Sequence, residues 1–168
     1  MTLTDTITIR PYTSTDADRL VAINAAAVPA TNLITRAELE ELVASALVCL
    51  VAERNGEPMG FLLCLGEGLA YESANYRWLS RQRNRFAYID RICVDEAARG
   101  NRIGEKLYFG LFQSLAGTKR PFVCEVNKRP PNPGSLRFHE RLGFAQIGEE
   151  DHGEKAVIFM ERALEDAR

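Results

Sequence analysis

The sequence predicts a mixed α/β fold, built as a single domain over residues 1–168, and three observations carry this prediction. Strand-like and helix-like segments follow one another along the chain, and neither a repeat nor a linker divides it. Hydrophobic residues make up 46% of the chain and charged residues 26%, as in ordinary globular proteins. A chain of 168 residues can bury a substantial core without disulfides or metals.

The amino-terminal part predicts one strand and two helices. Alternating apolar and polar residues predict a strand over 6–12. A helix over 16–27 follows and ends before Pro29. The second helix begins after Thr35, where Glu38 three residues later completes a capping box.

The central part predicts a hairpin, a long loop and a further strand. Apolar strands over 47–53 and 59–65 flank the Asn-Gly pair at 55–56, which is a strong hairpin signal. Residues 66–85 are predicted to be irregular, and loops of that length are often functional. Aromatic and β-branched residues predict a strand over 86–94.

The carboxy-terminal part alternates helices and strands. A helix from Gly104 and a strand over 121–126 come first, and a second helix starts at Asn132 and stops at Gly143. A strand over 155–162 closes the sheet, so the predicted order is β-α-α-β-β-β-α-β-α-β-β. The first of these helices has an apolar stripe for the core, formed by Ile103, Leu107, Leu111, Phe112 and Leu115.

Composition argues against several classes of protein. The net charge of −2 provides no overall positive potential that would attract nucleic acid. Neither a membrane span nor a signal peptide is expected, so a cytoplasmic location is predicted. Neither His139 nor His152 is spaced from a cysteine or from the other histidine as metal ligands usually are, so no metal is expected. The cysteines read as reduced core residues rather than disulfide partners: Cys49, Cys64, Cys93 and Cys124.

The segment from Val94 to Tyr108 has the features of an anion site. A strand leads through a tight turn into a helix start, where four backbone N–H groups lack helical partners. Cations are disfavoured at such a terminus, so Arg99 and Arg102 make sense if an anion binds there. The alternative is an ordinary helix start softened by glycine.

Two motifs resemble the GNAT N-acetyltransferase superfamily. RGNRIG resembles the pyrophosphate loop Arg/Gln-x-x-Gly-x-Gly/Ala, with Arg99 at the first position, Gly104 at the last and Arg102 in place of the middle glycine. NPGSLRFHERLGF is similar to Asn-x-x-Ala-x-x-Leu-Tyr-x-x-x-Gly-Phe. The element order also agrees, so the resemblance covers nearly the whole chain. The YIDRICV, CEVN and PPNP segments resemble a bacterial branch of predicted acetyltransferases.

The resemblance implies a fold and a co-substrate. The fold is a central, mostly antiparallel sheet of six to seven strands flanked by about four helices, with two central strands splayed to admit acetyl-CoA. No metal is implied. The implied cofactor-binding residues are Ile92, Cys93, Val94, Arg99, Gly100, Asn101, Arg102, Ile103, Gly104, Glu105, Asn127, Asn132, Ser135 and Phe138.

Three residues are candidates for proton transfer. Glu125 is the first candidate for the base, because a carboxylate in an apolar strand is costly and because some family members carry a catalytic glutamate there. Its alternative is an exposed or arginine-paired side chain. Asp90 is the second candidate, with pairing to Arg91 or Arg10 as the alternative. His139 replaces the family tyrosine and is the candidate acid; alternatively, it packs at the cofactor edge.

Two segments are expected to bind the acceptor. The first joins the opening helices, and the second is the aromatic and arginine-rich stretch 69–85, which would suit a small amine carrying a carboxylate. The alternatives for the second are a solvated face, a weak nucleic-acid contact or a homodimer interface. The predicted acceptor-binding residues are Asn32, Tyr76, Trp78 and Tyr88.

The sequence therefore predicts an acetyl-CoA-dependent N-acetyltransferase that acts by direct transfer in a ternary complex. The acceptor is a small-molecule or peptide amine, with an amino-acid-like molecule favoured. The alternatives are a non-catalytic acyl-CoA-binding sensor and, more weakly, a nucleic-acid-contacting protein.

Overall fold

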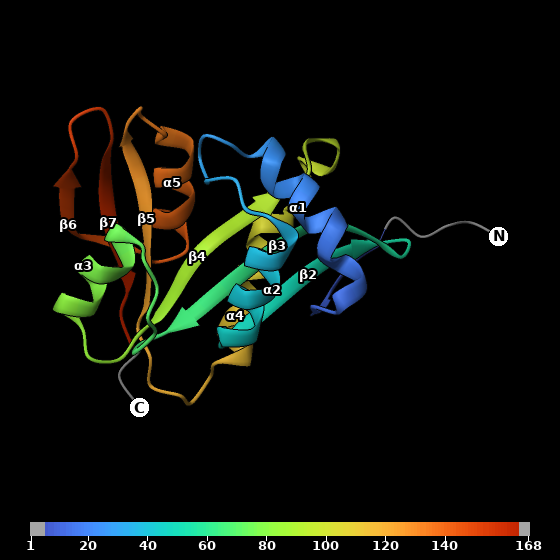
Figure 1. The fold of residues 1–168 in the computed structure, drawn as a ribbon, viewed down its shortest axis with the longest axis horizontal. Helices are drawn as coiled ribbons and strands as arrows, with labels where there is room; N and C mark the ends of the chain where they lie inside the picture. Colours follow the sequence, from blue (N-terminus) through green and yellow to red (C-terminus); the bar gives the residue numbers. More distant parts are fainter. Residues whose placement is uncertain (1–5, 165–168) are drawn as a thin grey trace. The chain divides into compact units, whose positions relative to one another are not determined.

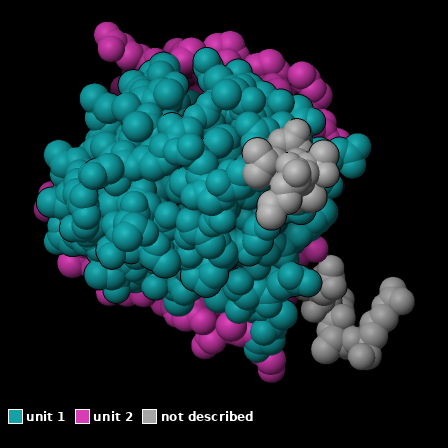
Figure 2. All heavy atoms as spheres, turned by 90° about the vertical axis from the view of Figure 1, so that its right-hand side faces the viewer, with its two compact units in different colours: residues 1–65, 90–117 teal, residues 66–89, 118–168 magenta. Residues whose placement is uncertain are grey.

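A computed structural model describes residues 6–164. The chain forms two compact units, coloured in Figure 2: unit 1 comprises residues 1–65 and 90–117, and unit 2 comprises residues 66–89 and 118–168. Seven strands form one sheet in the order β1-β2-β3-β4-β5-β7-β6. The pairing is mostly antiparallel, and this mixed α/β architecture confirms the predicted fold class.

Unit 1 contains the amino-terminal strands and helices. The α1–α2 segment, residues 27–35, joins its first two α-helices. The elements are β1 (Ile7–Pro11), η1 (Ser14–Asp16), α1 (Ala17–Ala26), α2 (Arg36–Ser45), β2 (Val48–Arg54), β3 (Glu57–Gly66), the last five residues of β4 (Ala87–Val94), η2 (Glu96–Ala98) and α4 (Ile103–Ser114).

Local sequence signals set several of these boundaries. Asn55 and Gly56 have φ of 53° and 80°, the left-handed pair that a tight hairpin turn requires. Thr35 accepts a hydrogen bond from the Glu38 amide, and Glu38 returns one to the Thr35 amide, both at 3.1 Å. The predicted hairpin and capping box are therefore confirmed.

The helices of unit 1 cover both faces of its strands. Figure 1 shows α1 and α2 on one face and α4 on the other. A Cβ on Gly110 of α4 would lie 3.0 Å from Ile9 and 3.1 Å from Leu50, so glycine lets the helix approach the sheet closely. Burial of these apolar faces supplies the main stabilisation of the unit.

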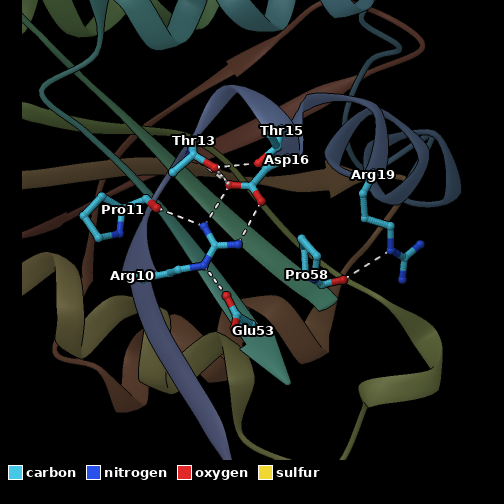
Figure 3. A network of polar contacts seen from close by, with 8 residues as sticks. All are labelled: Arg10, Pro11, Thr13, Thr15, Asp16, Arg19, Glu53 and Pro58. Atoms are coloured by element: carbon cyan, nitrogen blue, oxygen red, sulfur yellow. Dashed lines mark hydrogen bonds and ion pairs between the residues drawn. The ribbon is translucent and has the colours of Figure 1, made fainter. Parts of the chain in front are cut away.

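An ion network joins β1, β2 and η1 on the face opposite Ile9 (Figure 3). Arg10 donates two hydrogen bonds of 2.8 Å to Asp16 and also pairs with Glu53. The Arg10 guanidinium lowers the pKa of the Asp16 carboxyl, which is 4% exposed. This charged cluster anchors the start of α1 to the edge of the sheet.

Unit 2 contains the other half of the sheet. The first residues of β4 pair with β5 in parallel, at Ala87–Phe122 and Tyr88–Val123. The remaining elements are α3 (Ala74–Gln82), β5 (Phe122–Arg129), α5 (Pro133–Arg141), β6 (Ala145–Asp151) and β7 (Ala156–Arg162).

Helix α3 corrects the prediction that residues 66–85 are irregular, and it brings the α-helices of the described residues to five rather than about four. Ser73 caps the helix by accepting from the Tyr76 amide at 3.2 Å. Trp78 stacks on Phe159 of β7, with ring centroids 4.0 Å apart and planes within 2°. A Cβ on Gly148 of β6 would lie 2.6 Å from the Trp78 ring, so glycine makes room for the indole.

Two further expectations concern cysteines and membranes. The four cysteines are free thiols, and Cys64, Cys93 and Cys124 are buried, as predicted. Over residues 6–164, we find no helix with the length and apolar character needed to cross a membrane.

Candidate functional site

The loop before α4 has a backbone conformation that is easy for glycine and unfavourable for arginine. Arg102 is the N-cap of α4 with φ 55° and ψ 33°, in the left-handed region. Gly100 also has a positive φ, of 88°, and a Cβ there would meet no atom within 4 Å. Left-handed backbone costs a non-glycine residue about 1–2 kcal/mol, so Arg102 is held in a strained conformation.

Arg102, the N-cap of α4, has no side-chain capping hydrogen bond: its side chain accepts nothing from the amides of the first turn. The first bond of the helix runs from the Lys106 amide to the Arg102 carbonyl at 3.0 Å. The amides of Ile103, Gly104 and Glu105 therefore remain as the donors of a helix N-terminus, where the dipole is positive. An anion at this terminus would complete the hydrogen bonds that a capping side chain makes elsewhere.

Neighbouring strands fix the position of this helix start. A Cβ on Gly60 of β3 would lie 2.9 Å from the Cys93 carbonyl and 3.2 Å from Ile103, so glycine permits the close approach. Beyond β4, Asp95 accepts from the Ala97 amide at 2.8 Å and pairs with Arg19 of α1. Both contacts lower the pKa of the Asp95 carboxyl. The turn is thus anchored on two sides.

A buried polar network connects β4 to the α1–α2 segment. Arg91, 3% exposed, donates to the Asn24 Oδ1 at 2.8 Å and to the Asn32 Oδ1 at 3.0 Å. The Asn24 Nδ2 in turn donates to the Asn32 carbonyl at 2.9 Å. Asn24 is fully buried, whereas Asn32 is exposed. The network therefore ties a surface residue to the core of unit 1.

The same arginine engages Asp90. Its Nε donates to the Asp90 carboxylate at 2.7 Å, and both side chains are at most 4% exposed. The guanidinium of Arg91 therefore already occupies an oxygen of this buried carboxylate. The pairing to Arg91 that the sequence offered as the alternative for Asp90 is the arrangement found.

Glu125 lies in a different environment, within unit 2. It is half-buried on β5, opposite Phe159 of β7, and its Oε1 accepts from the Tyr88 hydroxyl at 2.9 Å. Tyr88 is 1% exposed and packs against Tyr76, with ring centroids 5.8 Å apart. The Glu125 carboxylate therefore accepts a hydrogen bond from the neutral hydroxyl of a buried tyrosine.

Helix α5 begins with a complete cap and carries the histidine. Asn132 accepts from the Ser135 amide at 3.2 Å, and Pro133 occupies the first helical position. His139 Nδ1 lies 2.8 Å from the Ser135 carbonyl, so the ring donates from Nδ1. Burial lowers the pKa of His139, which favours the neutral ring with its lone pair on Nε2.

The predicted aromatic acceptor residues lie in the packing of unit 2. Tyr76 is 2% exposed, and its hydroxyl donates to the Gly66 carbonyl at 2.7 Å. Trp78 is half-buried in its stack on Phe159. Two of the nearby arginines have structural partners: Arg83 pairs with Glu161 at 2.7 Å, and Arg85 donates to the Thr118 carbonyl at 2.7 Å.

Comparison with known proteins identifies the family. The model of the acetyltransferase (GNAT) family matches residues 17–144. The chain belongs to this family. It is accordingly an acyltransferase of the GNAT type, and the predicted recognition and enzyme class are confirmed.

Solved GNAT structures share the fold. Ard1 from Thermoplasma volcanium is 19% identical with a TM-score of 0.76, covering 95% of this chain and 99% of that one. A ribosomal-protein-alanine N-acetyltransferase from Brucella melitensis is 24% identical with a TM-score of 0.71, covering 94% and 99%. YncA of Salmonella typhimurium, solved with its cofactor acetyl-CoA, is 21% identical with a TM-score of 0.70, covering 96% and 95%. A search of curated proteins gives no match.

The GNAT motif explains Arg102. The family pattern has glycine at this position, and the left-handed backbone of Arg102 is the conformation that favours glycine. Arg102 therefore departs from the pattern in side chain and has a backbone conformation that glycine favours.

The predicted site residues fall into both units. In unit 1, the structure brings Ile103, Gly104 and Glu105 together at the α4 start and joins Asn32 to Asp90 through Arg91. In unit 2, it joins Tyr88 to Glu125, Asn132 to Ser135, and Phe138 edge-on to His139. Asn127 lies where the β5–β7 register shifts. The sequence analysis did not identify Arg91 as the centre of a polar network. The feature that could have indicated it is a charged residue within an otherwise apolar strand.

Proposed function

We propose that this GNAT protein is an acetyl-CoA-dependent N-acetyltransferase that transfers the acetyl group directly to a primary amine in a ternary complex. One observation supports acetyl-CoA as the co-substrate. The loop at the α4 start has positive φ angles at Gly100 and Arg102, and the helix has no side-chain cap among residues 6–164. A pyrophosphate accepts hydrogen bonds from such amides. Acetyl-CoA supplies the activated acyl group and a thiolate leaving group when bound.

The residues that would hold the co-substrate in unit 1 are the α4 loop, residues 99–105, and the end of β4. The amides of Ile103, Gly104 and Glu105 donate to the pyrophosphate, and Arg99 and Arg102 balance its charge from the exposed side. The backbone of Ile92, Cys93 and Val94 offers hydrogen-bonding groups to the pantetheine amides, as the family resemblance implies.

Glu125 is the proposed base. An amine attacks only when neutral, so a carboxylate or a water chain has to take its proton. The Tyr88 hydroxyl fixes the Glu125 carboxylate at 2.9 Å, while Asp90 is already held by Arg91. The contrast between the two carboxylates is the reason for choosing Glu125.

His139 acts as a proton acceptor more readily than as an acid. Its Nδ1 proton is used on the Ser135 carbonyl, and burial lowers the pKa of the ring, so near neutral pH Nε2 carries no proton to give. A histidine that gave a proton to the leaving thiolate would first have to charge in an apolar setting, next to Phe138 and Phe144.

The co-substrate is tested by thermal shift. Acetyl-CoA should raise the Tm, whereas ATP and NAD should not, because they lack the pantetheine arm. The control is Gln113→Leu, an exposed position in the last turn of α4, which should keep the shift. A protein that binds no form of CoA would overturn the proposal.

Catalysis is tested by release of free CoA over a panel of primary amines. Glu125→Gln should lower kcat by about 10²- to 10⁴-fold, the usual contribution of a general base, and keep the acetyl-CoA shift. Tyr88→Phe should lower kcat less and move the acid limb of the pH–rate profile upward, because it removes a hydrogen bond that favours the charged carboxylate. Binding without CoA release on any amine would instead indicate an acyl-CoA sensor.

A further inference from the structure

The exposed residue Asn32 has an orientation that its buried partners dictate. A guanidinium has only donors, so the Asn32 carboxamide must turn its oxygen toward Arg91, as the 3.0 Å contact shows. The Asn32 carbonyl is also taken, by Asn24 Nδ2 at 2.9 Å and by Arg91 Nη1 at 3.3 Å. The two acceptor oxygens of Asn32 therefore both face inward.

The amide nitrogen of the same side chain faces the other way. Asn32 is exposed, and within the described part of the chain no residue accepts from its Nδ2. The same α1–α2 segment exposes two apolar side chains: Val28 is 42% exposed and Leu33 is 65% exposed. An exposed donor whose direction is fixed by buried partners is a recognition element for an oxygen acceptor on a ligand.

The network below this donor is stiff. Arg91 and Asn24 are buried, and Thr31 and Cys93 also contact Asn24 Oδ1, at 3.5 Å and 3.9 Å. Breaking the hydrogen bonds to the two asparagines would leave buried N–H donors of Arg91 without acceptors, which is unfavourable. The Asn32 donor is therefore held in one direction before any ligand arrives.

We infer that Asn32 selects acceptor amines that carry an oxygen acceptor, a carbonyl or a carboxylate, next to the amine, and that Arg91 is the positioning residue that aims its amide. This inference rests on the proposed function, since it concerns the amine that would receive the acetyl group. It names a shared chemistry, because a free amino acid and a peptide amino terminus both place a C=O beside the amine.

Three matched amines test the selectivity of the unmodified protein: alaninamide, alanine and isopropylamine. All have a primary amine on a carbon that carries a methyl group, and only isopropylamine lacks the oxygen. We expect kcat/KM for alaninamide, alanine or both to exceed that for isopropylamine by about 10-fold, the value of one good hydrogen bond. Preference for alanine would indicate a free carboxylate, and preference for alaninamide a peptide carbonyl.

Two substitutions test the residue. Asn32→Leu should raise KM about 10-fold for the oxygen-bearing amines with kcat retained, because a binding interaction is lost, and should leave isopropylamine unchanged. Asn32→Asp should impair alanine more than alaninamide, because it turns a carboxylate oxygen outward toward the alanine carboxylate. Gln113→Leu, the loss of an exposed amide side chain in the last turn of α4, should change none of these constants.

Arg91→Lys tests the positioning role. It should raise KM for alaninamide as Asn32→Leu does, and the double variant should lose no more than either single variant, because both act through one amide. Asn32 is exposed, so its own variants decide the matter even where Arg91→Lys does not fold.

Two results would overturn the inference. One is a kcat/KM for isopropylamine that equals or exceeds the values for both alaninamide and alanine; the other is an equal loss on all three amines in Asn32→Leu. If the amine panel finds only substrates without a neighbouring oxygen, the inference fails while the proposed function stands. If no amine releases CoA, the proposed function itself fails.

Discussion

The starts of α4 and α5 solve the same problem in opposite ways. Helix α5 caps itself: Asn132 accepts from the Ser135 amide, and Pro133 removes one orphan donor from the first turn. Helix α4 has Arg102 in a left-handed conformation as its N-cap and no capping side chain from the described chain. The difference teaches that a helix start left incomplete by its own sequence is the better candidate for an anion site.

The largest expected effect is at the incomplete start. Gly104→Val adds a β-branched side chain in the first turn of α4, next to the amides proposed to bind pyrophosphate. Loss of one or two hydrogen bonds to a charged ligand, each worth about 1.5–3 kcal/mol, should weaken acetyl-CoA binding by about 100-fold or more. Isothermal titration calorimetry measures this. Unchanged affinity would mean that α4 is not the anion site.

The complete start should respond differently. Asn132→Ala removes the α5 cap and should lower the free energy of unfolding by about 1 kcal/mol, while the Tm increase caused by acetyl-CoA remains. Chemical denaturation with and without acetyl-CoA separates the two quantities, with Asn132→Ser as the control that keeps a capping oxygen. A smaller ligand-induced shift in Asn132→Ala would show that this side chain also contacts the co-substrate.

A smaller effect is expected from Arg102→Gly. Glycine adopts φ 55° without the penalty that arginine has, although it also loses more chain entropy on folding, so the net gain in unfolding free energy should be about 0.5–1 kcal/mol. Acetyl-CoA affinity should stay within a few-fold of the parent value. A destabilised Arg102→Gly protein would show that the side chain makes contacts that outweigh its backbone strain.

The smallest expected effect is a pH dependence that originates in α5. Burial lowers the pKa of His139 below its ordinary value of 6.5, so the unfolded chain binds a proton before the folded one does. Stability should therefore fall as the pH drops below about 6.5, through the folded pKa. Urea denaturation at several pH values should show a flatter profile for His139→Gln. Equal slopes would mean that His139 titrates alike in both states.

The sequence predicted most of the elements, because their signals are local. The Asn-Gly turn at 55–56, the Thr35 box and the Asn132 cap act within a few residues. Helix α3 was missed although Ser73 gave a cap and Tyr76 and Leu79 a buried face. What stabilises it is remote: Trp78 packs on Phe159 and above Gly148, 70 to 81 residues away along the chain.

The sequence could predict which types of residue form the candidate site, but it could not predict which of them contact one another. The glycines and arginines of residues 99–104 indicated an anion site from the sequence alone. No spacing rule could place Asn24 and Asn32 on Arg91, because the contacts span 67 and 59 residues. The same reason separates Asp90 from Glu125: the two carboxylates look alike in sequence, and only their partners differ.

Trp78 also gives the protein a built-in optical reporter. It is the only tryptophan in the sequence, and its ring is stacked on Phe159 within unit 2. Tryptophan emission therefore follows the α3–β7 contact of that unit alone, whereas far-ultraviolet circular dichroism follows the helices and strands of both units. Coincident melting curves from the two signals would mean cooperative unfolding of the whole chain, and separated curves would assign each transition to its own unit.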